Sequence, residues 1–264
     1  MIHLKLTLLA TMLFLPLLGQ AQTITYLGNE GVLIQNGQTK VMVDALFDEY
    51  NLRFHAPSAN LMTKIMTQTA PYDGVDLVLV THAHRDHFNA QIAVDYLNSN
   101  KEALMIVPPQ AIDSMKQYPE SFAKVKDRVN SFPWKKGWRQ ATFGEISIKT
   151  TYMLHAGKSN KYTQNAIYII NIGGKQVIHL GDTQMERDHF DNLRLEYENF
   201  DAAIVPFWYL TSVYGAELVR KFMHSKEIIG VHFPKKGFES SISKVKENFS
   251  SAILFTDIGQ KQTF

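Results

Sequence analysis

Short apolar runs along the chain predict β-strands, apolar and polar positions alternate at 146–153, and other runs repeat every three or four residues as in helices. Asn36-Gly37 lies between two such strands and predicts a tight hairpin, because both residue types tolerate positive φ. In the first half, the pattern predicts strands at 23–27, 32–35, 40–43, 75–80 and 104–107 and helices at 61–66, 90–97, 111–118 and 122–129. In the second half, it predicts strands at 146–153, 166–171, 176–180, 202–206, 227–231 and 253–255 and helices at 216–223 and 242–249.

Each half therefore begins with strands alone and continues with strands and helices in alternation. Two β-sheets with helices on their outer faces would bury these apolar runs. The sequence contains no low-complexity linker and no short-period repeat, so we predict an α/β (α+β) fold with one domain over residues 22–264. Residues 45–73 have little periodicity outside the short helix, and an irregular segment of this length is often a functional loop.

The first 21 residues have the pattern of a secretory signal peptide. Lys5 lies in the basic start, residues 6–18 are almost entirely apolar, and Gly19-Gln20-Ala21 ends in small residues. The apolar run is short for a membrane span, and Pro16 within it disfavours a buried helix. We predict a signal peptide at 1–21, cleavage after Ala21, and a periplasmic or secreted protein without a stable membrane anchor.

Composition excludes several classes of function. Hydrophobic residues make up 45% of the chain and charged residues 20%, as in a globular enzyme, and the net charge of +2 gives no electrostatic reason to expect a nucleic-acid partner. Residues 132–139 interleave tryptophans with basic residues, a pattern that can bind single strands; we favour a hairpin turn with packed tryptophans. Cysteine is absent, which excludes disulfides, a lipid-modified cysteine anchor and cysteine ligands or nucleophiles.

The strongest chemical signal is the stretch Thr81-His82-Ala83-His84-Arg85-Asp86-His87-Phe88, which directly follows an apolar strand. Imidazole and carboxylate groups at this density are the ligands that Zn²⁺ prefers. His82 and His84 would point to the same side of an extended segment but to nearly opposite sides of a helix. Asn89 precedes an apolar-periodic run and predicts a helix start. We therefore expect a strand, a loop that carries ligands, and a helix.

Four predicted strands end next to a residue that can bind a metal ion. These residues are His82, His155, Asp182 and His232. Ligands at strand ends are held by rigid elements and can converge on one rim of a sandwich. Gly157 and Gly181 lie close to two of them and allow the backbone to turn tightly. The sequence therefore predicts one metal centre assembled from distant segments.

This ordered set resembles the metal-binding motif of the metallo-β-lactamase-fold superfamily: His82-x-His84-x-Asp86-His87, then His155, Asp182 within Gly-Asp-Thr, and His232. Within the superfamily, the chain looks most like hydrolases related to ascorbate-phosphate lactonase. The resemblance implies a four-layer αββα sandwich. It also implies that His82, His84 and His155 hold one metal ion, that Asp86, His87 and His232 hold a second, and that Asp182 bridges the two ions. Asp44 would support the ligand loop through hydrogen bonds.

The implied chemistry is hydrolysis. Two divalent ions, Zn²⁺ in the first place with Mn²⁺ or Fe as alternatives, would lower the pKa of bound water from about 16 towards about 7 and polarise the attacked group. Asp86 would relay a proton in addition to its role as ligand. The chain lacks the cysteine ligand of dizinc β-lactamases, and it carries His84 where flavodiiron-type oxidoreductases usually place glutamate, which argues against redox chemistry.

The remaining histidines and several residues near the motifs have weaker assignments. We expect His3 in the signal peptide, His179 packed beside the centre, and His189 and His224 at the surface. His55 lies in the 45–73 loop, where it would either contact the substrate or have no role in the site. Trp208 and Tyr209 would form either a pocket wall or core, and Lys235 and Lys236 either an anion-binding pair or a solvated turn.

The leading functional hypothesis is an exported metal-dependent hydrolase that acts on a small lactone, ester or phosphodiester. Alternatives are a β-lactamase, a nuclease of the superfamily, and a non-catalytic metal-binding or sensing protein on the same scaffold. The metal ligands activate an electrophile and the loops choose it, so the residues do not identify the substrate. The physiological metals and the oligomeric state are likewise not encoded in these patterns.

Overall fold

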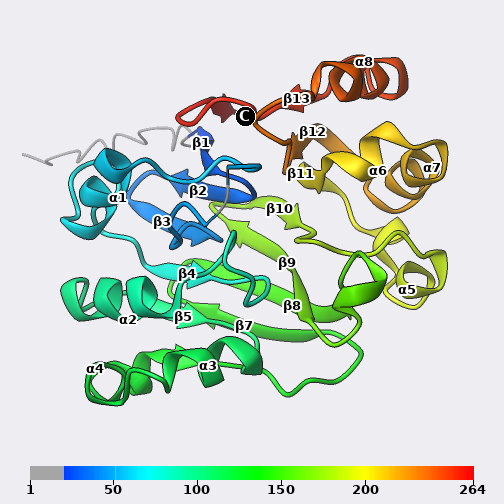
Figure 1. Ribbon diagram of the computed structural model, residues 1–264. Coiled ribbons are helices and arrows are strands. Elements are labelled where there is room, and N and C mark those ends of the chain that lie inside the picture. The colour runs from blue at the N-terminus through cyan, green and yellow to red at the C-terminus, as the bar shows by residue number, and fades with distance from the viewer. Residues whose placement is uncertain (1–20, 51) are drawn as a thin grey trace, which may run out of the picture.

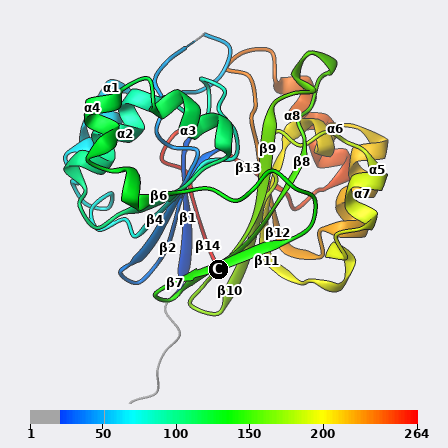
Figure 2. The ribbon, with the colours of Figure 1, turned by 90° about the horizontal axis from the view of Figure 1, so that it is seen from below.

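Two β-sheets pack face to face between two layers of helices (Figures 1 and 2). The structure, a computed structural model, describes residues 21–50 and 52–264, so the predicted signal peptide lies outside the described residues except for Ala21. The predicted αββα sandwich is confirmed. Its helices are α1 (Ala59–Met66), α2 (Ala90–Ser99), α3 (Pro109–Met115) and α4 (Pro119–Ala123) on one side, and α5 (Arg187–Asp191), α6 (Phe207–Thr211), α7 (Val213–Phe222) and α8 (Glu239–Asn248) on the other.

The first sheet contains most strands of the first half together with the last strand of the chain. Its order is β14 (Lys261–Thr263), β1 (Gln22–Gly28), β2 (Gly31–Asn36), β3 (Thr39–Val43), β4 (Leu77–Leu79), β5 (Leu104–Ile106) and β6 (Val129–Asn130). β2 and β3 form the predicted hairpin, with Gly37 at φ 58° in its turn. β3, β4, β5 and β6 run parallel, so β3 and β4 end at the same edge of the sheet.

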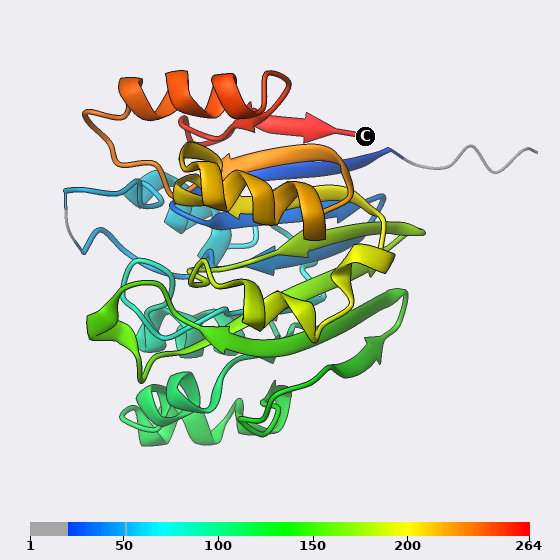
Figure 3. The same ribbon diagram turned by 90° about the vertical axis from the view of Figure 1, so that its right-hand side faces the viewer.

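The second sheet has a meander followed by parallel strands. Its order is β13 (Ile253–Leu254), β12 (Ser225–Val231), β11 (Phe200–Pro206), β10 (Lys175–His179), β9 (Gln164–Ile172), β8 (Ile146–Leu154) and β7 (Arg139–Phe143). β7 to β10 pair antiparallel, and β10 to β13 pair parallel. Figure 3 shows α7 and α5 lying across the outer face of this sheet.

The core consists of three apolar layers that follow from the strand pattern. Residues such as Ile34, Val41 and Ile170 fill the space between the sheets. Alternate residues on the first sheet face α1 to α4, and alternate residues on the second face α5 to α8. The side chains that the period-2 and helical patterns assign to the interior are thus buried on both faces of each sheet.

Two predicted elements are wrong. The helix expected at 122–129 ends early in α4, and a 3-10 turn (Lys126–Arg128) then leads into β6, because Val129 pairs with Met105 at the edge of the first sheet. Residues 132–139 form no hairpin; most of them make an irregular connection between the two sheets. Its tryptophans do pack: Trp134 lies against Tyr152 with ring centroids 4.2 Å apart, and Trp138 Nε1 donates to the Leu193 carbonyl at 3.0 Å.

None of the helices in the described part of the chain has the length and apolar character needed to cross a membrane. The irregular loop after β3 passes along the edge at which β3 and β4 end, and Phe54 in this loop forms a bridge to Pro234. The loop and the segment after β12 therefore lie side by side at one rim of the sandwich.

Candidate metal centre

The ligand-rich stretch after β4 has the predicted local structure. Residues 81–84 continue from the strand without helix, a turn follows at 85–87, and α2 begins at Ala90. The Asn89 side chain caps this helix by accepting from the Gln91 and Ile92 amides at 3.0 and 3.2 Å. The turn and the cap bring Asp86 and His87 to the same rim as His82.

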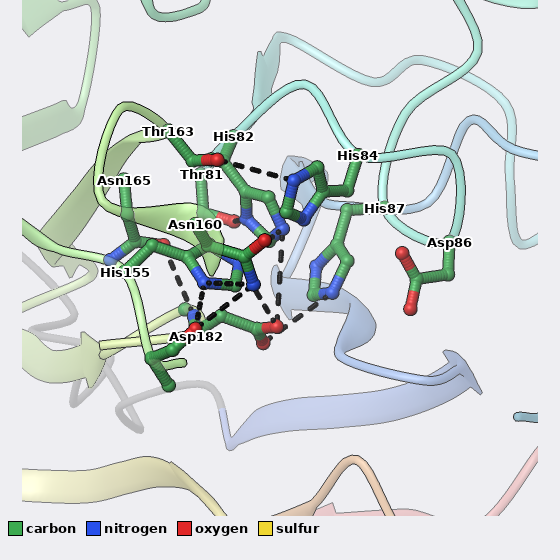
Figure 4. Close-up of polar contacts among 12 residues, drawn as sticks. Thr81, His82, His84, Asp86, His87, His155, Asn160, Thr163, Asn165 and Asp182 are labelled. Carbon is green, nitrogen blue, oxygen red and sulfur yellow. Dashed lines mark hydrogen bonds and ion pairs between the residues drawn. The ribbon is translucent and has the colours of Figure 1, made fainter. Parts of the chain in front are cut away.

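The structure brings together every residue of the predicted ligand set. Figure 4 labels all of them except His232. β8 ends before His155, β10 is followed by Gly181 and Asp182, and β12 ends before His232. Two groups have ligand atoms all within 4.8 Å of one another: His82, His84 and His155 form one, and Asp86, His87 and His232 the other. These are the two groups that the resemblance implies.

Asp182 lies between the two groups, and each of its oxygens faces a different one. Oδ2 is 3.3 Å from His155 Nε2 and 4.0 Å from His82 Nε2. Oδ1 is 3.5 Å from His87 Nε2 and 3.4 Å from His232 Nε2. A carboxylate in this position can place one oxygen on each of two cations.

A buried hydrogen-bond network sets the orientation of two imidazoles. Asp44 Oδ1 accepts from the Thr81 amide at 2.7 Å, and Oδ2 accepts from the Thr81 hydroxyl at 2.5 Å and from His87 Nδ1 at 2.9 Å. Because the Thr81 hydroxyl donates to Asp44, it accepts from His82 Nδ1 at 2.9 Å. The hydrogen bonds of His82 and His87 are thus made by Nδ1, and the Nε2 atom of each ring faces the centre. Hydrogen bonds of this kind usually fix the orientation of a histidine that binds a metal ion.

The other two histidines of the first group are also held in place. His155 Nδ1 lies 2.7 Å from the Ala156 carbonyl, to which it donates, so Nε2 faces the centre. The Asn160 amide donates to the same carbonyl at 3.0 Å. The Thr163 hydroxyl lies 3.2 Å from His84 Nε2. The segment after β8 thus supplies both a candidate ligand and its support.

Asp182 is positioned by its backbone. Gly181 has φ 54°, and a Cβ there would lie 2.7 Å from Asn165 Oδ1 and 2.8 Å from Thr81 Cβ. The Asp182 amide donates to Asn165 Oδ1 at 3.1 Å. Only glycine fits this close approach of β10 to the Thr81 segment. The glycine expected to permit a tight turn therefore brings the two sheets together at the centre.

Burial and neighbouring charges separate the protonation states. Burial, helped by the nearby His87 and His155 rings, lowers the pKa of His82 well below its usual value, and burial and His155 lower the pKa of His84. Burial acts against charge on His87 too, but the Asp182 and Asp44 carboxylates outweigh it and raise its pKa to about 10. Burial opposes ionisation of Asp182, yet His232 and His87 hold its pKa well below the usual range. The Asp182 carboxylate is therefore ionised at neutral pH.

The donor set fits divalent cations. Asp182 Oδ1 and both ring nitrogens of His232 are buried and have no hydrogen-bond partner among the described residues. Buried polar atoms are usually satisfied, and imidazole nitrogens with carboxylate oxygens are ordinary ligands of Zn²⁺ and related metals. A cation beside Asp182 Oδ1 and His232 Nε2, which lie 3.4 Å apart, would satisfy these two atoms.

The secondary assignments have mixed outcomes. His179 is fully buried beside the centre and His224 is exposed, as expected. His189 is only partly at the surface: its side chain is 16% exposed, and it lines a cavity together with residues 134–137. Tyr209 is core, whereas Trp208 lies 5.1 Å, centroid to centroid, from the His232 ring.

His55 and the lysine pair lie beside the centre rather than in it. His55 lines a cavity of about 650 Å³ together with Lys235 and Met62, and it also borders a small cavity that Asp86 lines. Lys235 forms an ion pair with Glu49, which neutralises it, and Lys236 is exposed. These contacts weaken the interpretation of the pair as an anion-binding site.

Besides Asn160, Thr163 and Asn165, described above, sequence patterns missed three residues at the centre. The Asn29 side-chain amide lies 3.0 Å from His87 Nε2 and 3.4 Å from Asp86 Oδ2. The Phe54 ring meets the His232 ring edge-on at 4.4 Å. Glu30 is fully buried, and burial, followed by Asp182, raises its pKa well above the usual value. A short turn and an irregular loop carry these residues, and neither has a periodicity that predicts its position.

The fold and the histidine–aspartate centre define a metal-dependent hydrolase of the metallo-β-lactamase fold. Residues 39–226, more than half of the chain, match the family described as the beta-lactamase superfamily domain. The chain belongs to this family, and the resemblance drawn from the sequence is confirmed at the level of the superfamily.

Relatives and solved structures agree with this assignment. A UPF0173 metal-dependent hydrolase from Thermus thermophilus is 22% identical over 216 residues, which cover 80% of this chain and 83% of the relative. The metallo-beta-lactamase fold protein YhfI from Bacillus subtilis superposes with a TM-score of 0.62 at 15% identity, covering 93% of this chain and 100% of the other. A possible metal-dependent hydrolase from Veillonella parvula gives a TM-score of 0.63 at 16% identity with the same coverage.

Proposed function

We propose that this protein is an exported hydrolase with two divalent metal ions, which cleaves a small lactone, ester or phosphodiester. The observation that carries the proposal is the division of the Asp182 oxygens between the two ligand groups, at 3.3–4.0 Å on one side and 3.4–3.5 Å on the other. A site for one ion would not need a carboxylate between two complete groups. Export is inferred from the pattern of residues 1–21 alone.

When bound, two such ions supply a nucleophile from water at neutral pH and a Lewis acid for the electrophilic oxygen. The chain supplies the geometry. His82, His84 and His155 would hold one ion, and Asp86, His87 and His232 the other, with Asp182 shared. Asp44 and Thr81 keep the two buried rings in the orientation that binding requires. Fixed ligands of this kind avoid reorganisation during the reaction.

Asp86 is the acid of the centre that faces solvent most openly. Its side chain is 20% exposed, compared with 11% for Asp182 and none for Asp44. Asn29 Nδ2 donates to the Asp86 backbone carbonyl at 3.1 Å and to Asp86 Oδ2 at 3.4 Å. This placement supports a role in passing a proton to solvent or to a leaving group, in addition to holding a metal ion.

Aromatic side chains flank the second group and favour a small substrate. Phe54 and Trp208 each meet the His232 ring edge-on, at 4.4 and 5.1 Å between centroids. They come from the loop after β3 and from α6, so the two walls belong to different layers of the sandwich. Lys235 would favour an anionic substrate if its charge were free, but it forms an ion pair with Glu49. The structure therefore gives little support for a highly charged substrate.

The proposal is tested by a panel of lactones, esters, phosphodiesters, thioesters and β-lactams on protein of measured metal content. We expect two ions per chain and hydrolysis of at least one lactone, ester or phosphodiester. A chelator should abolish the activity, and Zn²⁺ or Mn²⁺ should restore it. Because a ligand at 1,000 times its Kd stabilises the folded state by about 4 kcal/mol, the chelator should also lower the melting temperature. Two bound ions without cleavage of any substrate would favour the metal-binding reading instead.

A further inference from the structure

Glu30 is a buried acidic residue with no assigned role in the metal centre described above. It lies in the turn between β1 and β2, its exposure is 0%, and neither of its oxygens accepts a hydrogen bond from an N–H or hydroxyl donor among the described residues. Its side-chain hydrogen-bonding neighbour among these residues is the Asp182 carboxylate, and two carboxylates bond only if one carries a proton. No ion pair with lysine or arginine in the described ranges involves it. Buried charges in proteins are nearly always paired or bound to metals.

The turn holds Glu30 against the centre. Gly31 packs so tightly that a Cβ would lie 2.7 Å from the Asp44 carbonyl. Asn29 has φ 47°, and its carbonyl accepts from the His232 amide at 3.0 Å. The backbone on either side of Glu30 is therefore fixed to two strands that carry residues of the metal centre.

The residues around the Glu30 carboxylate show which of the two ligand groups it is near. One of its oxygens lies with His87 and Asp182 in a group whose ligand atoms are all within 4.8 Å of one another. On its other side, His179 Nε2 donates to the Glu30 carbonyl at 3.0 Å, and His179 Nδ1 accepts from the Gly181 amide at 3.2 Å. His179 has thus committed both nitrogens, and its Nδ1 remains 3.9 Å from Glu30 Oε2. The neighbouring imidazole does not satisfy the carboxylate.

We propose that Glu30 is a further ligand of the metal position formed by Asp86, His87 and His232, a step that rests on the two-metal centre proposed above. Both Glu30 oxygens and Asp182 Oδ1 receive no hydrogen bond from an N–H or hydroxyl donor among the described residues, and a cation beside His87 would satisfy Asp182 Oδ1 and the Glu30 oxygen that faces it. A second carboxylate at this position adds oxygen donors and negative charge. Such a position favours harder ions such as Mn²⁺ or Fe²⁺ more than a histidine-rich one does.

The main competing role is that of a neutral acid that donates a hydrogen bond to Asp182. Glutamine distinguishes the two roles, because it retains the volume and a donor but removes the carboxylate. We therefore compare wild type, Glu30→Gln and the control Glu247→Gln, which removes an exposed glutamate on α8. Metal-free proteins are titrated calorimetrically with Mn²⁺ and separately with Zn²⁺, and ion content is measured after dialysis.

We expect Glu30→Gln to bind one ion as the wild type does and the second about 10- to 100-fold more weakly, with the larger loss for Mn²⁺. The control should match the wild type. Unchanged affinities for both ions in Glu30→Gln overturn the proposal while leaving the two-metal centre intact. Uptake of fewer than two ions by the wild type overturns the centre itself, and the role of Glu30 with it.

A measurement on the wild type covers the case in which the variant does not fold. In crystals of the Mn²⁺-loaded protein, a Glu30 oxygen should lie within ligand distance, about 2.0–2.2 Å, of the ion on the His87 side. If both Glu30 oxygens lie more than about 3 Å from both ions, Glu30 is no ligand and the proposal is wrong.

Discussion

Replacing Asp182 with alanine is expected to remove the bound metal ions and to reduce hydrolysis by at least about 10³-fold. The two Asp182 oxygens face different ligand groups, so the substitution removes a contact from both positions at once. It also leaves His87, His155 and His232 as clustered imidazoles without the carboxylate that compensates them. Metal content by mass spectrometry and initial rates on the same samples measure both effects.

His84→Ala provides the companion test, because His84 belongs to one group only. Here too, bound metal and activity should fall together. The matched control is His224→Ala, which removes an exposed histidine outside the ligand set and should change neither quantity. If Asp182→Ala and His84→Ala both retained metal-dependent turnover, the assignment of the centre would be wrong.

Replacing Asp44 with alanine is expected to have the largest effect on stability. Asp44 is buried, accepts from the Thr81 amide, the Thr81 hydroxyl and His87 Nδ1, and has no role as a ligand in the proposed centre. Its removal leaves these donors buried without a partner. Breaking a buried charged pair typically costs about 3–5 kcal/mol, and loss of a residue that orients a ligand lowers metal affinity about 10- to 100-fold.

Denaturant unfolding of metal-free protein and calorimetric metal titration measure these two quantities. Because Asp44 has φ 45°, part of the alanine effect comes from the backbone, and Asp44→Asn keeps a residue type that tolerates this conformation. Asparagine should still lower the metal affinity, since its amide cannot accept from both His87 and the Thr81 hydroxyl. Asp95→Ala on the exposed face of α2 serves as control and should stay within about 0.5 kcal/mol of wild type. An Asp44→Ala variant as stable as this control would contradict the account.

The sequence contained most of the information about the layers and the ligands. Short apolar runs predict most of the strands, because each sheet is buried on both faces and both kinds of position are therefore apolar. The Asn36-Gly37 pair predicts the turn between β2 and β3, because both residues tolerate positive φ. The spacing of His82 and His84 is informative because extended backbone is the conformation in which residues two apart share a side. Gly181 and Asn89 also indicate local features that the structure contains: a close approach of the backbone at Gly181 and the start of α2 after Asn89.

The remaining features depend on contacts between distant segments. Val129 has the spacing of a helical residue, but it becomes a strand residue because β5 offers it an unpaired edge. Arg128 reinforces this by donating to the carbonyls of Asn100 and Ala103 at 2.8 and 2.9 Å. Glu30 and Phe54 reach the centre only because their turn and loop pack against Asp44 and Pro234. No local pattern encodes such packing.

The central claim is that two metal ions lie on either side of the Asp182 carboxylate. Anomalous diffraction from crystals of the metal-loaded protein, recorded above and below the metal edge, tests it most directly. We predict two anomalous peaks, one among His82, His84 and His155 and the other among Asp86, His87 and His232, with an Asp182 oxygen bound at each. A single peak, or two peaks that do not share Asp182, would contradict the account.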